Sequence, residues 1–271
     1  MQMNKEAHFD VLAADYDTAF SQSMIGLEQR RISRKWLEAF LANKGPLQIL
    51  EINCGTGEDA WWLASLGHSV IATDQSPAMI AAAKQKTSML PEGREPGFAV
   101  CSFENLGELF RCRQFDLIFS NFSGLNCVSP TALQKLGREW RVLLSDSGHL
   151  AVVLFGKYSL WEIFYFLIRS DSRNAFRRWG HKEVRVPLRE EIDQPVYYYS
   201  TGRFSRNLPS FRVKLTRPVG LFIPPSYMEG FVQRNPGVFR WLLRLEKLAG
   251  WFSGASQLAD HTYILLKKEP Q

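Results

Sequence analysis

The segment Leu50-Glu51-Ile52-Asn53-Cys54-Gly55-Thr56-Gly57 ends a short apolar run that begins at Leu47. A helical pattern of apolar residues, from Ala60 to Leu66, follows it at once. Short apolar runs bounded by glycine are typical of buried strands, and glycine lets the backbone turn tightly and approach a ligand closely. The segment therefore predicts a strand, a sharp turn and a helix in immediate succession.

The same alternation of strands and helices continues along the first half of the chain. Further strands are expected at 68–74, 98–101, 115–120 and 148–155, and helices are expected from Ser76-Pro77 and from Pro130 to Leu144. Nearly continuous apolar strands that alternate with helices are typical of a parallel sheet covered on both faces. We therefore predict an α/β fold with a doubly wound, mostly parallel sheet, in which ligands bind beyond the carboxyl ends of the strands.

An acidic residue at the end of the second expected strand indicates what the turn binds. Asp74 lies 17 residues after Gly57, and a carboxylate there can accept hydrogen bonds from the two hydroxyls of a ribose. The pattern Gly55-x-Gly57-x-x-Ala60 also fits a loose dinucleotide-binding motif, so the glycines alone leave a nicotinamide cofactor open. Glu51, four residues before Gly55, would repel a pyrophosphate and would suit a cationic ligand.

Segment 50–57 resembles the glycine-rich signature of class I S-adenosylmethionine-dependent methyltransferases, and the small-molecule and lipid branch of that family is the most similar. Asn53 stands where the family usually has its first glycine, and Asp74 matches the family's ribose-binding acid. The resemblance implies a Rossmann-like, seven-stranded sheet with an antiparallel last strand. We place the sixth strand near 211–217 and the last at 262–267.

Other segments resemble the same family. The N-terminal helix that closes over the cofactor in this family is similar to the segment that contains Phe9-Asp10, Ala14 and Tyr16-Asp17. The segment that lines the adenine is similar to 102–106, and the motif beside the reactive methyl is similar to 115–122. Ser102 stands where the family commonly has aspartate. The resemblance implies S-adenosyl-L-methionine as cofactor, S-adenosyl-L-homocysteine as product, and the following cofactor-binding residues: Tyr16, Glu51, Asn53, Gly55, Gly57, Asp74, Gln75, Ser102, Phe103, Glu104 and Asn121.

We expect one elaborated domain. It comprises a cofactor-binding core at 1–156, a lid insertion at 157–210, and the last two strands at 211–271, which are joined by a helical insertion at about 218–260. In this topology both insertions leave from the cofactor edge of the sheet and should lie over the cofactor. The expected substrate contacts are Tyr197, Tyr199, Arg203 and Tyr227. His261 enters the last strand at the same edge, so it is a candidate for substrate contact or for a base, with a structural role as the alternative.

Composition excludes several classes of protein. With 271 residues, 45% of them hydrophobic and 22% charged, the chain can bury a large core and is not a disordered polymer. The longest strongly apolar run, 160–168, is about half a membrane span and contains a carboxylate. The first twenty residues carry four carboxylates, which a signal peptide would not tolerate. Four sparse cysteines favour neither disulfides nor a metal site, so a cytoplasmic protein without bound metal is expected.

The positive charge of the chain is concentrated in its second part. Residues 1–156 carry a net charge of −3, and residues 157–271 carry +9. The basic residues of the lid insertion are Arg169, Arg173, Arg177, Arg178, Lys182, Arg185 and Arg189. This excess indicates either an ordinary solvated surface or a surface that meets an anionic substrate, carrier or membrane.

An aromatic, apolar and basic lid favours a small, hydrophobic and anionic methyl acceptor. O-methylation of a carboxylate is the favoured reaction, because a carboxylate needs no base and arginine can bind it with two hydrogen bonds. A cofactor-binding regulatory or scaffold protein and a nicotinamide oxidoreductase are the alternatives. An acidic carrier protein and a membrane contact through 159–178 are possible partners, nucleic acid is disfavoured, and the oligomeric state is open.

Overall fold

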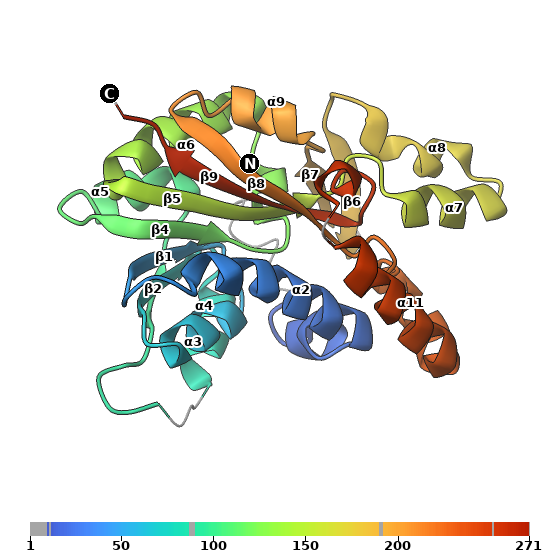
Figure 1. Ribbon diagram of the computed structural model, residues 1–271, viewed down its shortest axis with the longest axis horizontal. Coiled ribbons are helices and arrows are strands. Elements are labelled where there is room, and N and C mark those ends of the chain that lie inside the picture. The colour runs from blue at the N-terminus through green and yellow to red at the C-terminus, as the bar shows by residue number, and fades with distance from the viewer. Residues whose placement is uncertain (1–9, 11, 87–89, 190–191, 251, 271) are drawn as a thin grey trace.

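A seven-stranded sheet forms the centre of the computed structural model, which describes residues 10, 12–86, 90–189, 192–250 and 252–270 (Figure 1). The strand order is β3-β2-β1-β4-β5-β9-β8. Only β9 runs antiparallel to its neighbours in this sheet, β5 and β8. This arrangement confirms the predicted doubly wound, Rossmann-like sheet. The strands are β1 (Gln48–Ile52), β2 (Ser69–Asp74), β3 (Gly97–Val100), β4 (Phe115–Ser120), β5 (Leu144–Phe155), β8 (Phe211–Val219) and β9 (His261–Lys268).

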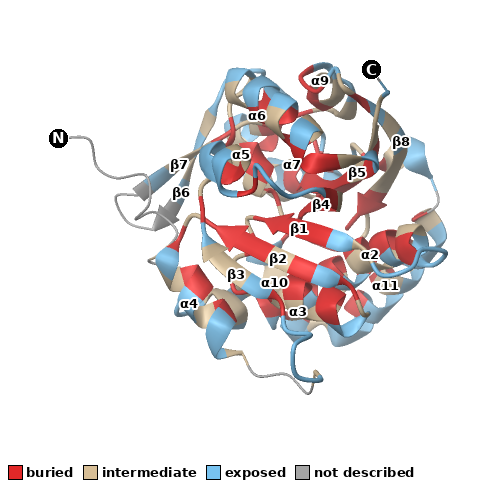
Figure 2. Ribbon diagram, turned by 90° about the vertical axis from the view of Figure 1, so that its left-hand side faces the viewer, coloured by how far each residue is buried: buried red, intermediate tan, exposed pale blue. Residues whose placement is uncertain are grey.

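Two apolar layers explain why the central strands are hydrophobic at most of their positions. Ile49 of β1 joins the layer beneath α2 (Met24–Leu41) and α3 (Glu58–Ser65). Leu50, the next residue, joins the opposite layer with α6 (Pro130–Leu143). Successive side chains of a strand point to opposite faces, so a strand buried on both faces needs a continuous apolar run. Figure 2 shows β1, β2 and β4 almost wholly buried between these layers.

Helix boundaries follow recognisable capping signals. Ser76 caps α4 (Pro77–Gln85) by accepting a hydrogen bond from the Met79 amide at 3.1 Å. Ser129 does the same for α6, and in both helices proline occupies the first position. Helix α2 is an element that the sequence analysis did not identify, although Ser23 caps it in the same way.

In its described part, the insertion that follows β5 contains three short α-helices and a hairpin. Its elements are α7 (Leu160–Ile168), α8 (Ser172–Ala175), a 3-10 turn at Arg177–Trp179, β6 (Val184–Arg189), β7 (Ile192–Val196) and α9 (Thr201–Arg206). Strands β6 and β7 pair with each other as a separate two-stranded sheet. Glu162 of α7 binds Arg177 at 2.9 Å and Arg178 at 2.7 Å. These two arginines of the basic run are therefore part of the internal structure.

The helical segment before β9 packs beside α2, and none of its described residues lines the cavity at the carboxyl edge of the sheet. It contains α10 (Glu229–Arg234) and α11 (Pro236–Ala249). The Glu229 carboxylate accepts hydrogen bonds from the Met24 and Ile25 amides at the start of α2, at 2.9 and 3.0 Å. This position differs from the expectation that 218–260 would lie over the cofactor, because Glu229 anchors the segment at the amino end of α2.

None of the helices in the described part of the chain has both the length and the apolar character that crossing a bilayer requires.

The junction between β5 and the insertion leaves no room for a side chain. A Cβ at Gly156 would lie 1.9 Å from the carbonyl oxygen of Ala259. We expect Gly156→Ala to lower the free energy of unfolding by about 1–3 kcal/mol, since the clash is with backbone. Gly180→Ala is the matched control, because nothing lies within 4 Å of its Cβ position. Urea denaturation measures both, and equal stability of the two variants would contradict this packing.

Candidate functional site

The turn between β1 and α3 has an unusual backbone. Asn53, Gly55 and Gly57 all have positive φ angles, of 53°, 53° and 77°. Glycine adopts this left-handed region without strain, and asparagine is among the few other residues that tolerate it. A Cβ at Gly57 would also lie 2.9 Å from Ala83 and from the ring of Phe98. The turn is therefore compact, and α3 begins directly after it.

Asn53 connects this turn to the end of β4. Its side-chain amide donates a hydrogen bond to the Asn121 carbonyl at 2.8 Å, and its side-chain oxygen accepts one from the Ser120 hydroxyl at 2.6 Å. A glycine at position 53 could make neither bond. The asparagine thus keeps the backbone conformation of the turn and adds a connection between two neighbouring strand ends.

Asp74 connects the same turn to the end of β2. One carboxylate oxygen accepts a hydrogen bond from the Gly55 amide at 2.9 Å, and the other accepts one from the Ser76 amide at 2.9 Å. Burial raises the pKa of Asp74, and these backbone hydrogen bonds oppose that rise. Each oxygen keeps a further lone pair, so the carboxylate can still accept two hydrogen bonds from a ligand.

The N-terminal segment contacts these two turns. The Asp10 carboxylate accepts hydrogen bonds from the Ser76 hydroxyl and, at 3.3 Å, from the Ala78 amide. Asp17 accepts one from the Thr56 hydroxyl at 2.6 Å. Tyr16 lies between them, and burial raises the pKa of its phenol to about 12, so it stays a neutral hydroxyl at physiological pH. Phe9 lies outside the described residues.

The loop after β4 places an aromatic ring beside the turn. Phe122 and Ser123 have φ angles of 48° and 67°, which non-glycine residues rarely adopt in succession. The Phe122 ring lies edge-on to Phe20 at 4.9 Å and has the Arg30 guanidinium 4.8 Å from its centre. Contacts on two sides therefore hold this strained loop in place.

A buried charge network lies behind the β1–α3 turn. The Asp59 carboxylate binds Arg30, accepts a hydrogen bond from Arg34 at 2.7 Å and accepts another from the Asn121 amide at 2.8 Å. These partners hold the pKa of Asp59 below its usual range in spite of burial. Glu51 has no such set of partners, and one of its buried oxygens lacks a hydrogen bond among the described residues. Burial and the nearby Asp59 charge raise the pKa of Glu51 well above its usual range.

These elements enclose a cavity of about 450 Å³ at the carboxyl edge of the sheet. One half is formed by the β1, β2 and β3 strand ends and by Tyr16. The other half is formed by the loop after β4, the start of α6 and the β6–β7 hairpin. The residues of this second half are Phe122, Gly124, Cys127, Val128, Ser129, Ala132, Glu183, Arg185, Gln194, Pro195 and Tyr197.

Most of the expected cofactor residues lie together at this cavity. The ones that line it are Tyr16, Asn53, Gly55, Asp74, Gln75, Phe103, Glu104 and Asn121. Three others do not line it. Glu51 is buried in β1, before the turn, and Gly57 is the residue that caps the start of α3. Ser102 does not line the cavity, but the residues on either side of it, Cys101 and Phe103, do.

The expected substrate residues are more dispersed. Tyr197 lines the cavity, but Tyr199 is buried and its hydroxyl donates to the Val128 carbonyl at 2.6 Å. Tyr227 packs against Tyr165 of α7 with ring centres 4.7 Å apart, away from the lining residues. The rings of Tyr197 and Tyr199 stack with their centres 6.5 Å apart, and of this pair only Tyr197 lines the cavity.

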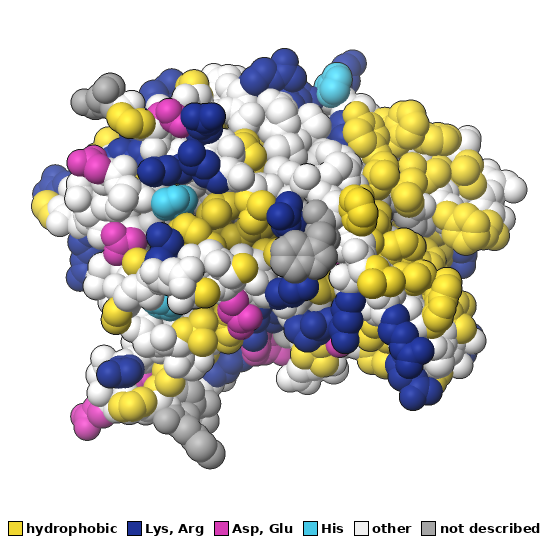
Figure 3. All heavy atoms as spheres, viewed as in Figure 1, with side chains coloured by type: hydrophobic (Ala, Val, Ile, Leu, Met, Phe, Trp, Pro, Cys, Tyr) yellow, Lys and Arg dark blue, Asp and Glu magenta, His cyan; other side chains and the backbone are white. Residues whose placement is uncertain are grey.

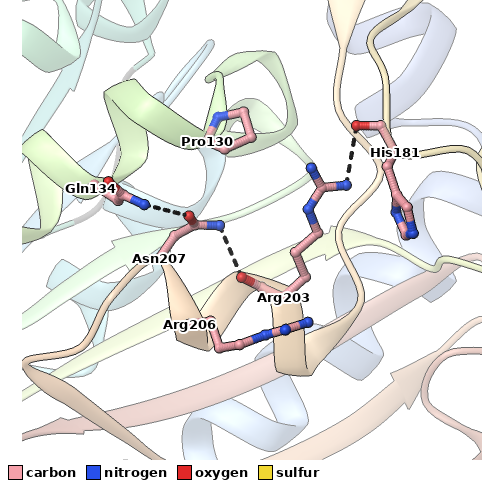
Figure 4. Close-up of a pocket in the computed structure, with 6 residues that line it drawn as sticks. All are labelled: Pro130, Gln134, His181, Arg203, Arg206 and Asn207. Carbon is pink, nitrogen blue, oxygen red and sulfur yellow. Dashed lines mark hydrogen bonds between the residues drawn. The ribbon is translucent and has the colours of Figure 1, made fainter.

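Arg203 belongs to a second, open recess, which Figure 4 shows. Its guanidinium donates to the His181 carbonyl at 3.1 Å, and Arg206, Asn207, Gln134 and Pro130 complete the walls. Asn207 accepts a hydrogen bond from the Gln134 amide at 3.1 Å. Arg203 therefore stands on the outer side of the insertion and does not reach the first cavity.

His261 lies one layer behind the cavity wall. Its ring stacks on Phe155 at 5.0 Å and meets the edge of Phe122 at 5.7 Å, and its Nδ1 lies 3.3 Å from the Asp260 carboxylate. Phe122 thus stands between His261 and the cavity. This geometry corrects the expectation of direct substrate contact, since entry into β9 at the carboxyl edge does not by itself expose a side chain to the cavity.

Several lining residues were not singled out from the sequence. Phe122 is the last residue of segment 115–122, which resembles the fourth-strand motif, and this is a usable signal. Arg185 belongs to the basic run of the lid insertion, but that run does not show which of its members face the cavity. Cys127 and Gln194 carry no signal, because they reach the cavity through the loop that precedes α6 and through the hairpin. Within the described residues, no group of His, Cys, Asp or Glu side chains is arranged to hold a metal ion.

Comparison with known proteins gives two kinds of match. Residues 49–148 match the model of a family described as a methyltransferase domain. YqeM of Bacillus subtilis (strain 168), which is provisionally named a methyltransferase, is 46% identical over 54 residues. These are 20% of this chain and 21% of YqeM, so the chain matches about a fifth of the length of this curated relative.

Solved structures match over nearly the whole chain. Magnesium protoporphyrin IX methyltransferase (ChlM) from Synechocystis PCC 6803, with bound S-adenosylhomocysteine, has a TM-score of 0.62 at 14% identity, over 97% of this chain and 98% of ChlM. The PH0226 protein from Pyrococcus horikoshii OT3 has a TM-score of 0.56 at 15% identity, over 94% and 99%. At such identities the likeness establishes the fold.

The raised pKa of Glu51 leads to a prediction about how the stability of the fold depends on pH. Because the pKa of Glu51 is raised in the folded chain, the unfolded chain loses this proton at a lower pH than the folded chain does, so the carboxyl makes the folded state less stable as pH rises above about 4.5. We expect Glu51→Gln to raise Tm at pH 8 by about 2–4 °C or more, and by less at pH 4.5. Thermal melts over this pH range measure the difference, with the exposed Glu108→Gln as control. A variant less stable than the wild type at pH 8 would show that Glu51 is ionised in the fold.

Proposed function

We propose that this chain, which has the class I S-adenosylmethionine-dependent methyltransferase fold and carries a methyltransferase domain at 49–148, methylates a small, hydrophobic and anionic molecule. The favoured reaction is O-methylation of a carboxylate. The observation that carries the proposal is one continuous cavity, whose first half offers nucleoside-binding groups and whose second half is largely apolar and aromatic, with Arg185 at its mouth.

The first half of the cavity fits S-adenosylmethionine. Asp74 has two free lone pairs for the ribose hydroxyls, and Phe103 with Met79 provides apolar walls for the adenine. The buried Glu51 carboxyl, one oxygen of which has no hydrogen bond among the described residues, and Asn121 lie beside the turn that would receive the charged end. When bound, S-adenosylmethionine supplies a methyl group that is activated by its bond to a positively charged sulfur.

The residues of the second half of the cavity favour a methyl acceptor that is already deprotonated when it binds. Its titratable lining residues are Cys127, Glu183, Arg185 and Tyr197. Burial raises the pKa of Cys127 to about 12, so the thiol stays neutral. Glu183 accepts a hydrogen bond from the Tyr197 hydroxyl at 2.9 Å and lies 3.7 Å from Arg185. Since these groups engage one another, none is a free base, and the residues chiefly have to hold the acceptor in line with the transferred methyl.

The direct test is methyl transfer itself. The protein is incubated with S-adenosylmethionine that carries a labelled methyl group, together with a panel of aromatic and aliphatic carboxylic acids and a metabolite extract. The proposal expects a labelled ester, identified by mass spectrometry. Tight cofactor binding without any labelled product would instead favour a regulatory or scaffold protein. Thermal stabilisation by NAD but not by S-adenosylmethionine would favour an oxidoreductase.

Asp74 provides a test of the cofactor half. Asp74→Asn keeps the size of the side chain but removes the charge and one acceptor oxygen, so we expect the affinity for S-adenosylmethionine to fall about 10- to 100-fold. Isothermal titration calorimetry measures this change. Asp116→Asn, at the opposite end of β4, is the control and should bind as the wild type does. If the Asp74 variant bound S-adenosylmethionine as tightly as the wild type does, Asp74 would not be the residue that binds the ribose.

Arg185 provides a test of the acceptor half. Its side chain is 69% exposed at the cavity mouth, where it can bind an acceptor carboxylate. We expect Arg185→Gln to raise KM for a carboxylate acceptor about tenfold with little change in kcat, because the contact is made before and during transfer alike. Arg212→Gln, exposed on the edge strand β8, is the control. An equal KM for the two variants would contradict an anionic acceptor bound at the hairpin.

A further inference from the structure

Helix α7 has an apolar face that the described residues leave exposed. Its exposed residues Leu160, Phe164, Leu167 and Ile168 recur at the spacing of one helix face. Phe164 is 58% exposed and Ile168 is 66% exposed. Side chains of this size are normally buried, and a contiguous group of them on a surface marks an interaction site.

Aromatic side chains extend this face. Trp179 meets Tyr158 edge-on with ring centres 5.5 Å apart, and Phe176 lies 4.9 Å from Trp179. All three rings remain partly exposed. Tryptophan and tyrosine combine an apolar ring with a polar group, which suits the boundary between lipid and water.

A second apolar stripe lies on α11 and just after it. Val238, Trp241, Leu248 and Phe252 are exposed, with Leu248 at 73%. Figure 1 shows that α7, α8 and α11 project from the same end of the molecule, and Figure 3 shows hydrophobic side chains gathered over that end. We call the exposed side chains of 158–182, of 238–250 and of Phe252 the apolar end.

The exposed charges of the apolar end are positive. Two of its carboxylates are buried: Glu162 binds two arginines, and Glu246 accepts hydrogen bonds from the Gly220 and Phe222 amides. Asp171 is partly exposed, and its carboxylate caps α8 by accepting hydrogen bonds from Asn174. The cations are instead exposed, namely Arg169, Arg173, Lys182, Arg240, Arg244 and Lys247. Over these described segments, the surface therefore combines exposed apolar groups with positive charge.

We propose that the apolar end binds the surface of an anionic lipid bilayer. The apolar side chains would enter the boundary between headgroups and acyl chains, and the surrounding cations would meet the lipid phosphates, as in interfacial amphipathic helices. The binding is peripheral. It does not depend on methyl transfer, so it can be tested separately from the proposed function.

A bilayer fits this surface better than a protein does. Two copies of the chain joined through it would bring like charges together, which opposes association. A protein partner usually fills a pocket with its anchoring side chains, but neither cavity described above has a lining residue in α7, α8 or α11. A bilayer needs no pocket, because it accepts projecting apolar side chains.

Vesicle sedimentation tests the proposal on the full chain without cofactor or acceptor. We expect binding to phosphatidylcholine vesicles that contain about one third phosphatidylglycerol, and at least about tenfold weaker binding to pure phosphatidylcholine. Binding should weaken as salt rises from about 0.1 to 0.5 M but should not vanish, since the apolar contacts remain.

Matched variants identify the surface. Phe164→Ser and Trp241→Ser should each reduce the partition coefficient about tenfold, and Arg173→Gln about fivefold. Val142→Ser removes a side chain that is 68% exposed on α6 and should have no effect, as should Arg212→Gln. Circular dichroism and thermal melts of each variant confirm that it folds.

Three outcomes would overturn the proposal. One is the absence of binding to both kinds of vesicle, whether or not the chain binds an acidic protein. Another is equal binding by the Phe164→Ser and Val142→Ser variants. The third is a dimer in sedimentation velocity that Phe164→Ser dissociates, together with no vesicle binding, which would make the apolar end an interface between copies.

Discussion

The Asp74 carboxylate is the interaction on which the site depends. By accepting the Gly55 and Ser76 amides, it fixes the turn after β1 to the turn after β2. Parallel pairing alone aligns the two strands but leaves the loops beyond them free. Asn53 likewise fixes the turn after β1 to the end of β4, through hydrogen bonds with Ser120 and Asn121. Three neighbouring strand ends are thus held together, and the cavity takes its shape from them.

Much of the core follows from local sequence. The apolar runs at 115–120 and 48–52 are strands because both faces of the sheet are covered, and Ser76-Pro77 begins a helix through its capping hydroxyl. Asn53 keeps the left-handed turn at a position where glycine is usual, because asparagine tolerates that conformation. The comparisons accordingly agree with the resemblance found in the sequence.

The insertions could not be placed from sequence in the same way. Pro187 lies within β6 and Pro195 lies within β7. Because proline is uncommon inside strands, the sequence does not indicate a hairpin here. Arg177 and Arg178 belong to a basic run, but the buried Glu162 engages both of them. His261 stands at the expected edge with Phe122 in front of it. Each outcome depends on contacts between distant segments, which charge and periodicity along the chain do not encode.

The hairpin β6–β7 is hydrogen-bonded as a sheet of its own, although it supplies a wall of the second half of the cavity, where we propose that the methyl acceptor binds. Mutations in it therefore leave the ladder of the central sheet intact. The cofactor half has no such freedom, because each of its turns is bonded to a neighbouring strand end. During evolution, acceptor preference can consequently diverge between homologues much faster than the donor chemistry, and one scaffold can acquire many acceptors.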